Sequence, residues 1–202
     1  EKLHAIPMGN SIKRIEAPPV FRADDYMFHA HCNDPRRLVN DLAIVSNNGD
    51  LSRFHKMKLH VEKTKKVEIL ALGGSITAGG YFEGFKKLLQ EEEKLDVIVH
   101  NHGHGATELT YTIFCIEIDK YNPDIILIDF SVNDYGHPKL MDALIRKSLT
   151  LGVEKGGEMP YVVLVNLWVE KYCPFPRYLI HSQYYNIPLI NVCPAVNLCY
   201  GK

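Results

Sequence analysis

The pattern of hydrophobic and polar positions changes near residue 67. From there on, short uninterrupted apolar runs alternate with longer stretches in which apolar residues recur every three or four positions. Uninterrupted runs are typical of strands buried on both faces, and the recurring pattern is typical of amphipathic helices. The predicted strands span 67–72, 96–100, 124–130, 161–167 and 188–192, and the predicted helices span 81–94, 107–121, 138–150 and 176–185.

This alternation of strands and helices predicts an α/β fold. Strands that are separated by helices pair in parallel through right-handed crossovers, and the helices cover both faces of the sheet. We therefore expect a three-layer αβα sandwich with a flavodoxin-like parallel five-stranded sheet. The length of 202 residues is sufficient for one such domain.

Residues 1–66 are predicted to form an N-terminal extension packed on the main domain, which spans 67–202. The extension is irregular and interrupted by prolines, and it contains expected helices at 34–46 and 51–64. The second helix is basic and carries one apolar stripe, formed by Phe54, Met57 and Val61.

Composition narrows the classes of partner. Lysine plus arginine (23) and aspartate plus glutamate (24) nearly cancel and give a net charge of −1, which offers no attraction for nucleic acid or an anionic membrane. No apolar run reaches the roughly 20 residues of a membrane helix, so we expect no membrane-spanning segment. The five cysteines lack CxxC spacing, which argues against a zinc site. The positions of the cysteines are compatible with free thiols and with one disulfide. The sequence is accordingly compatible with the secretory pathway and with the cytoplasm, and it does not determine the oligomeric state.

Candidate chemistry lies where three of the predicted strands end, because ligands bind at the carboxyl ends of parallel strands. The first strand is followed by GGSITAG (73–79), a strand-to-helix turn that exposes the hydroxyl of Ser75. The second is followed by NHGHGAT (101–107), whose glycines let a backbone N–H approach a substrate oxygen closely. The third is followed by SVND (131–134), in which the amide of Asn133 can donate into the same space.

These three loops together meet the requirements of acyl transfer. That reaction needs a nucleophile and several hydrogen-bond donors aimed at one developing oxyanion. Ser75 N–H, a glycine N–H and the Asn133 side chain would supply three donors. The glycine-rich turn lacks both the GxGxxG spacing and the lysine of a P-loop, so a nucleotide site is disfavoured.

In order and spacing, the three loops resemble the SGNH hydrolase superfamily, also called GDSL-type, in the GGSIT variant of its eukaryotic and viral members. The resemblance covers about residues 67–192 and implies that Ser75 is the nucleophile and Asn133 an oxyanion donor. It makes Gly105 the counterpart of the glycine in the second block, with Gly103 as second choice. It also implies acyl-ester hydrolysis without a cofactor or metal, on a small-molecule or polysaccharide ester such as a carbohydrate O-acetyl ester.

The sequence departs from this family in three places. Gly74 replaces the usual aspartate before the serine, and Ser131 replaces the usual glycine of the third block, which would narrow the oxyanion pocket. The family's fourth block, an Asp-x-x-His pair after the fifth strand, is missing up to Lys202. The only pair with that spacing, Asp134 and His137, lies in the loop after the third strand.

Three explanations fit the missing base. The catalytic histidine lies beyond Lys202, the chain is an inactive relative, or another histidine substitutes, with Asp134 and His137 as possible additional site residues. The functional hypotheses are accordingly an ester hydrolase or O-acyltransferase, and a non-catalytic carbohydrate- or partner-binding module. Three further histidines, His100, His102 and His104, alternate in the sequence and could share one face of an extended segment, as metal ligands can. No cysteine or carboxylate cluster stands nearby in the sequence to complete a metal site.

Overall fold

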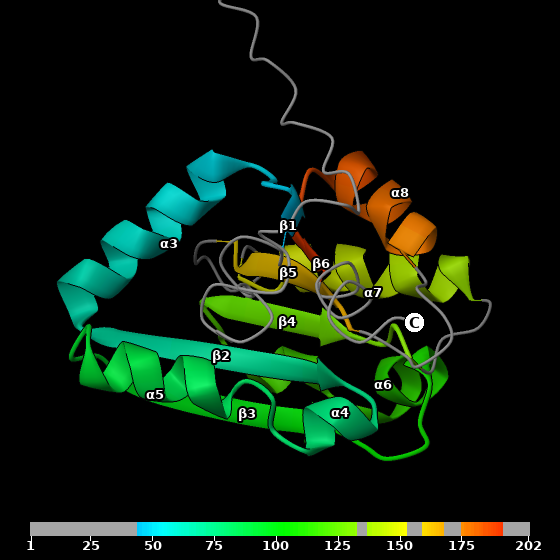
Figure 1. Cartoon of the computed structure of the whole chain (residues 1–202), viewed down its shortest axis with the longest axis horizontal. Helices are drawn as coiled ribbons and strands as arrows, with labels where there is room; N and C mark the ends of the chain where they lie inside the picture. The colour runs from blue at the N-terminus through cyan, green and yellow to red at the C-terminus, as the bar shows by residue number, and fades with distance from the viewer. Residues whose placement is uncertain (1–43, 133–136, 153–158, 168–174, 192–202) are drawn as a thin grey trace, which may run out of the picture.

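The computed structural model describes residues 44–132, 137–152, 159–167 and 175–191 (Figure 1). These residues form one six-stranded sheet in the order β1-β6-β5-β4-β2-β3. The strands are β1 (Ile44–Asn47), β2 (Lys66–Gly73), β3 (Asp96–Gly103), β4 (Ile125–Asp129), β5 (Tyr161–Asn166) and β6 (Leu189–Asn191). The last five strands run parallel to one another, and their order is that of flavodoxin-like sheets. The predicted fold class is confirmed.

The helices lie in two layers on opposite faces of this sheet. They are α3 (Leu51–Thr64), α4 (Ser75–Ala78), α5 (Glu83–Glu91), α6 (Leu109–Cys115), α7 (Pro138–Thr150) and α8 (Phe175–Tyr185), with a 3₁₀ turn, η2, at Ile118–Lys120. Successive residues of β2 point to opposite faces, as in any strand. Leu70 and Leu72 pack with α6, α7 and α8, whereas Ile69 and Ala71 pack on the side of α3 and α5.

Helix α3 confirms its predicted bounds and lies against the sheet. Asp50 caps its first turn by accepting a hydrogen bond from Ser52 N–H at 2.8 Å. Val61 is buried, Met57 packs beside it, and the ring of Phe54 lies 5.4 Å from that of Tyr161.

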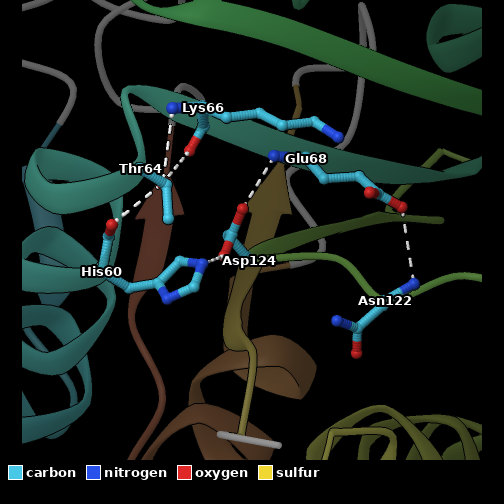
Figure 2. A network of polar contacts seen from close by, with 6 residues as sticks. All are labelled: His60, Thr64, Lys66, Glu68, Asn122 and Asp124. Atoms are coloured by element: carbon cyan, nitrogen blue, oxygen red, sulfur yellow. Dashed lines mark hydrogen bonds and ion pairs between the residues drawn. The ribbon is translucent and has the colours of Figure 1, made fainter.

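Asp124, just before β4, connects this helix to the amino ends of two strands (Figure 2). Its carboxylate accepts a hydrogen bond from Glu68 N–H at 2.8 Å and lies 3.6 Å from His60 Nε2. Glu68 Oε1 in turn accepts from Asn122 N–H at 3.4 Å. This network fastens the end of the sheet opposite to the loops that carry the candidate chemistry.

The predicted helix at 34–46 is wrong where the structure can test it. Residues 44–46 belong to β1, which pairs antiparallel with β6, and the rest of that helix lies outside the described residues. A β-branched segment beside an open sheet edge gains ladder hydrogen bonds there, and this tertiary pairing overrides the local helical pattern.

Two other helices are shorter than predicted. Helix α6 ends at Cys115 because the backbone of Ile116 is extended, which lets both Ile116 and Ile118 enter the core. Helix α5 buries fewer of its apolar side chains than its helical pattern predicts. Phe82, which precedes the helix, is buried, whereas Phe85 and Leu88 within it are exposed. No helix in the four described segments is both long and apolar enough to cross a membrane.

Candidate active site

Ser75 is the first residue of α4, and only Gly74 separates this helix from β2. Helix α4 lies at the carboxyl ends of β2 and β3 (Figure 1). Gly74 N–H donates to Asp129 O at 3.3 Å, which ties the turn to the end of β4. A Cβ atom on Gly73 would lie 2.0 Å from Thr77 Oγ1 and 2.4 Å from Asp129 O, so only glycine allows these elements to approach so closely. The Ser75 side chain is exposed, and within the described part of the chain neither its hydroxyl nor its N–H has a hydrogen-bond partner.

The end of β3 and the loop that follows it pack directly on this turn. His104 N–H donates to Gly73 O at 3.1 Å, and a Cβ atom on Gly103 would lie 2.1 Å from Ala78 N. The predicted meeting of the first two loops therefore occurs. Ala106, the residue after Gly105, has a φ of 56°, an unusual value for a residue with a side chain and one that often marks functional loops.

The two candidate glycines differ in what their backbone N–H groups can do. Gly103 N–H donates to Asn101 Oδ1 at 2.8 Å, so it is already used. Gly105 N–H has no acceptor among the described residues, and no heavy atom lies within 4 Å of the position that a Cβ there would take. Of the two, Gly105 is thus the one whose N–H is available to a ligand.

Of the third loop, the structure describes Ser131 and Val132. Asn133 and Asp134 lie outside the described residues. Ser131 is buried, donates its hydroxyl hydrogen to Asp129 Oδ1 at 3.0 Å and accepts from Leu167 N–H at 2.9 Å. The serine that replaces the family's glycine therefore joins the ends of β4 and β5 through its hydroxyl.

Asp129 is the residue at this edge that sequence reasoning missed. It ends β4, is only 2% exposed, and accepts hydrogen bonds from the hydroxyls of Thr77 (3.2 Å) and Ser131 (3.0 Å). Burial raises its pKa to about 6, although the two hydroxyls act against this rise. Burial and the Asp129 charge also raise the pKa of Tyr81, whose hydroxyl is buried and unpaired among the described residues. The available signal was an acidic residue inside an otherwise apolar strand run, ILIDF.

The described histidines have partners other than Ser75. His137 precedes α7, is exposed and lies 3.6 Å from Glu108 Oε2. His100 Nε2 lies 3.1 Å from Glu68 Oε1, and His102 Nε2 lies 2.7 Å from the hydroxyl of Tyr121. Across the ranges that the structure describes, no group of three or more histidine, cysteine or acidic side chains is placed to hold a metal ion.

Comparison with known proteins gives structural relatives but no sequence relatives. No family model matches the chain, and no curated protein does. A crystal structure of a two-domain esterase active on acetylated mannans, co-crystallised with mannopentaose, matches 76% of the chain at 24% identity with a TM-score of 0.63. A second structure of such an esterase matches 76% of the chain at 23% identity with a TM-score of 0.57.

A more distant match is a putative GDSL-like lipase from Parabacteroides merdae. It is 18% identical over 61% of this chain and 76% of its own, with a TM-score of 0.47. The two esterase structures show that the chain shares their α/β fold. The chain spans only 46% of the length of each of them.

Proposed function

We propose that this chain is part of a serine ester hydrolase of SGNH type, with Ser75 as its nucleophile. The observation that carries the proposal is the packing of the Gly105 loop on the Ser75 turn through His104 N–H and Gly73 O, which are 3.1 Å apart. We expect two backbone N–H groups, those of Ser75 and Gly105, at the same sheet edge as the exposed serine hydroxyl, and neither N–H has an acceptor among the described residues. The fold that the chain shares with an esterase supports the same proposal.

In the proposed reaction, Ser75 Oγ attacks the ester carbonyl carbon while a base takes the hydroxyl proton. The N–H groups of Ser75 and Gly105, with the side chain of Asn133, hold the oxyanion of the tetrahedral intermediate. Collapse of the intermediate expels the alcohol, which takes up the proton, and leaves an acyl group on Ser75. Water then releases the acid; a second alcohol in place of water would make the protein an O-acyltransferase.

The base that this scheme requires is, in the SGNH family, a histidine of the fourth block, and residues 192–202 contain no histidine. A serine hydroxyl is a poor nucleophile unless a neighbouring base activates it. No described histidine is hydrogen-bonded to Ser75, and His137 is engaged by Glu108. The same observation favours a second candidate function, a carbohydrate-binding module that retains the loops and lacks the base.

We propose a carbohydrate O-acetyl ester as the substrate. The structural relative with the TM-score of 0.63 is an esterase active on acetylated mannans. The exposed position of Ser75 at the surface is compatible with a bulky polysaccharide, which a deep and narrow pocket would exclude.

The test is hydrolysis of 4-nitrophenyl acetate by the protein in its full encoded length. Ser75→Ala is expected to lower kcat by at least about 10³-fold, because loss of the nucleophile of a serine hydrolase removes most of its rate enhancement. Ser52→Ala, which removes an exposed serine from the first turn of α3, is the matched control and keeps the wild-type rate. Equal rates for wild type and Ser75→Ala would contradict the proposal. No turnover combined with mannooligosaccharide binding would favour the binding module.

A further inference from the structure

Buried polar contacts centred on Asp129 connect the Ser75 helix to the third loop. One carboxylate oxygen accepts from Thr77 Oγ1 in α4, and the other accepts from Ser131 Oγ. Thr77 is completely buried and stands two residues after the proposed nucleophile, whereas Ser131 stands two residues before Asn133. Asp129 therefore connects the segment that carries the proposed nucleophile to the segment that carries Asn133. An oxyanion site depends on the position of these two segments relative to each other.

The same network continues to the neighbouring strands on both sides. The hydroxyl of Ser131 accepts from Leu167 N–H at the end of β5. On the other side, Thr77 O accepts from Asn101 Nδ2 at 3.2 Å, and Asn101 Oδ1 accepts from Gly103 N–H in β3. The contacts cross the carboxyl ends of four adjacent strands, from β3 through β2 and β4 to β5.

We infer that Asp129 is a positioning residue for the proposed hydrolysis, whose carboxylate sets the position of Ser75 relative to the donors of the second and third loops. The inference rests on the proposed function and adds to it a residue that does not itself contact the substrate. A carboxylate is suited to this task because it only accepts hydrogen bonds. Both hydroxyls must then donate toward it, which leaves a lone pair of Ser131 free for Leu167 N–H.

A role in folding alone does not account for a carboxylate at this place. No cationic side chain in the described ranges pairs with Asp129, and a buried charge without such a partner opposes folding. Apolar side chains of similar volume often serve stability equally well or better. Buried groups with a shifted pKa are typical of functional sites, where geometry is held at the expense of stability.

Asp124 provides a matched comparison on the other end of the same strand. Its carboxylate accepts a hydrogen bond from Glu68 N–H in β2, and burial raises its pKa, as burial does for Asp129. It contacts His60 in α3 and Glu68 in β2, at the opposite end of β4 from Asp129 (Figure 2). Removal of Asp124 should therefore weaken the fold and leave the site geometry intact.

The test compares four variants of the full-length protein by kcat and KM with 4-nitrophenyl acetate and by melting temperature. Asp129→Ala and Thr77→Val are expected to lower kcat about 100-fold, the loss associated with a misplacement of about 1 Å, and to change KM less than threefold. Asp129→Asn has the same shape and can still hydrogen-bond to both hydroxyls, so it restores kcat to within about tenfold of wild type. Asp124→Ala lowers the melting temperature and leaves kcat unchanged.

Two outcomes would overturn the inference. In the first, Asp129→Ala and Thr77→Val lower the melting temperature as Asp124→Ala does while kcat stays at the wild-type value. Such a result leaves the proposed function standing if Ser75→Ala abolishes turnover. In the second, wild type itself is inactive, so that the proposed function fails, and a crystal structure of Thr77→Val superimposes on wild type at Ser75 and Gly105. A shift of Ser75 relative to Gly105 in that structure would support positioning even without activity.

Discussion

Thr77 Oγ1 lies 3.2 Å from Asp129 Oδ2, which ties the short helix that starts at Ser75 to the end of the central strand β4. The contact depends on the residue opposite, because a Cβ atom on Gly73 would lie 2.0 Å from the same Thr77 oxygen. A small residue at the end of β2 and a hydroxyl in α4 are therefore two parts of one packing arrangement.

Gly103→Ala is expected to destabilise the protein, whereas Gly105→Ala is expected to have little effect on stability. The added methyl group at Gly103 would lie 2.1 Å from Ala78 N and would force β3 and α4 apart, which costs about 1–3 kcal/mol. At Gly105 the methyl group meets no atom within 4 Å, so the free energy of unfolding should change by less than about 0.5 kcal/mol. Urea denaturation measures both values, and equal losses would show that the loop does not pack on α4 as described.

The stability contributed by Asp129 should depend on pH. Burial raises its pKa from 3.8 to about 6, so the folded state binds the proton more tightly than the unfolded state does. Protonation therefore favours folding fully below pH 4, and this contribution is lost as the pH rises through 6. From the two pKa values it amounts to about 3 kcal/mol.

Asp129→Asn removes this titration and provides the measurement. The free energy of unfolding of wild type minus that of Asp129→Asn should fall by about 2.5 kcal/mol between pH 4 and pH 7, because at pH 4 the unfolded carboxyl is already partly ionised. Denaturant titrations at each pH give the difference. A difference that is constant over this range, or that grows with pH, would contradict a buried carboxylate at this position.

Ala106→Gly should stabilise the protein by up to about 1 kcal/mol. Ala106 has a φ of 56°, a conformation that glycine adopts without steric cost and that other residues rarely adopt. Ala78→Gly is the control of opposite sign, because Ala78 lies in α4 and glycine destabilises a helix by about 0.5–1 kcal/mol. Melting curves should show a higher melting temperature for Ala106→Gly and a lower one for Ala78→Gly than for wild type. A lower melting temperature for Ala106→Gly would mean that the loop backbone is not strained.

His137→Ala tests whether the histidine nearest to the third block replaces the missing base. His137 is exposed and paired with Glu108, and such surface pairs contribute about 0–1 kcal/mol to stability. We expect the full-length variant to keep most of the wild-type esterase rate, as should Glu108→Gln. If His137→Ala loses activity to the same extent as Ser75→Ala, the base is His137 and no histidine beyond Lys202 is needed.

The parts of the fold that could be predicted are those whose signal is local. Strands β2, β4 and β5 are largely buried on both faces, so each appears in the sequence as a mainly apolar run. Helix α7 begins and ends as predicted because Pro138 occupies its first turn and its apolar residues recur at helical spacing. Local patterns of this kind do not depend on the rest of the chain.

The parts that could not be predicted depend on partners far away in the sequence. Strand β1 exists because Ile44 pairs with Asn191 near the other end of the described chain, a contact that no local pattern reports. The role of Asp129 likewise depends on hydroxyls from two other segments, α4 and the loop after β4. At the candidate site, the proximity of the Ser75 and Gly105 loops could be predicted from the topology alone, because the carboxyl ends of parallel strands lie at one edge of the sheet.

The central claim, that Ser75 is an activated nucleophile, is tested most directly by covalent labelling. The full-length protein is treated with a 4-nitrophenyl phosphonate ester, which phosphonylates an activated serine irreversibly at Oγ and releases 4-nitrophenol. The protein is then analysed by peptide mass spectrometry. We predict one adduct, located on Ser75 and missing from the Ser75→Ala variant. An unlabelled wild-type protein, or equal labelling of the Ser75→Ala variant, would contradict the claim.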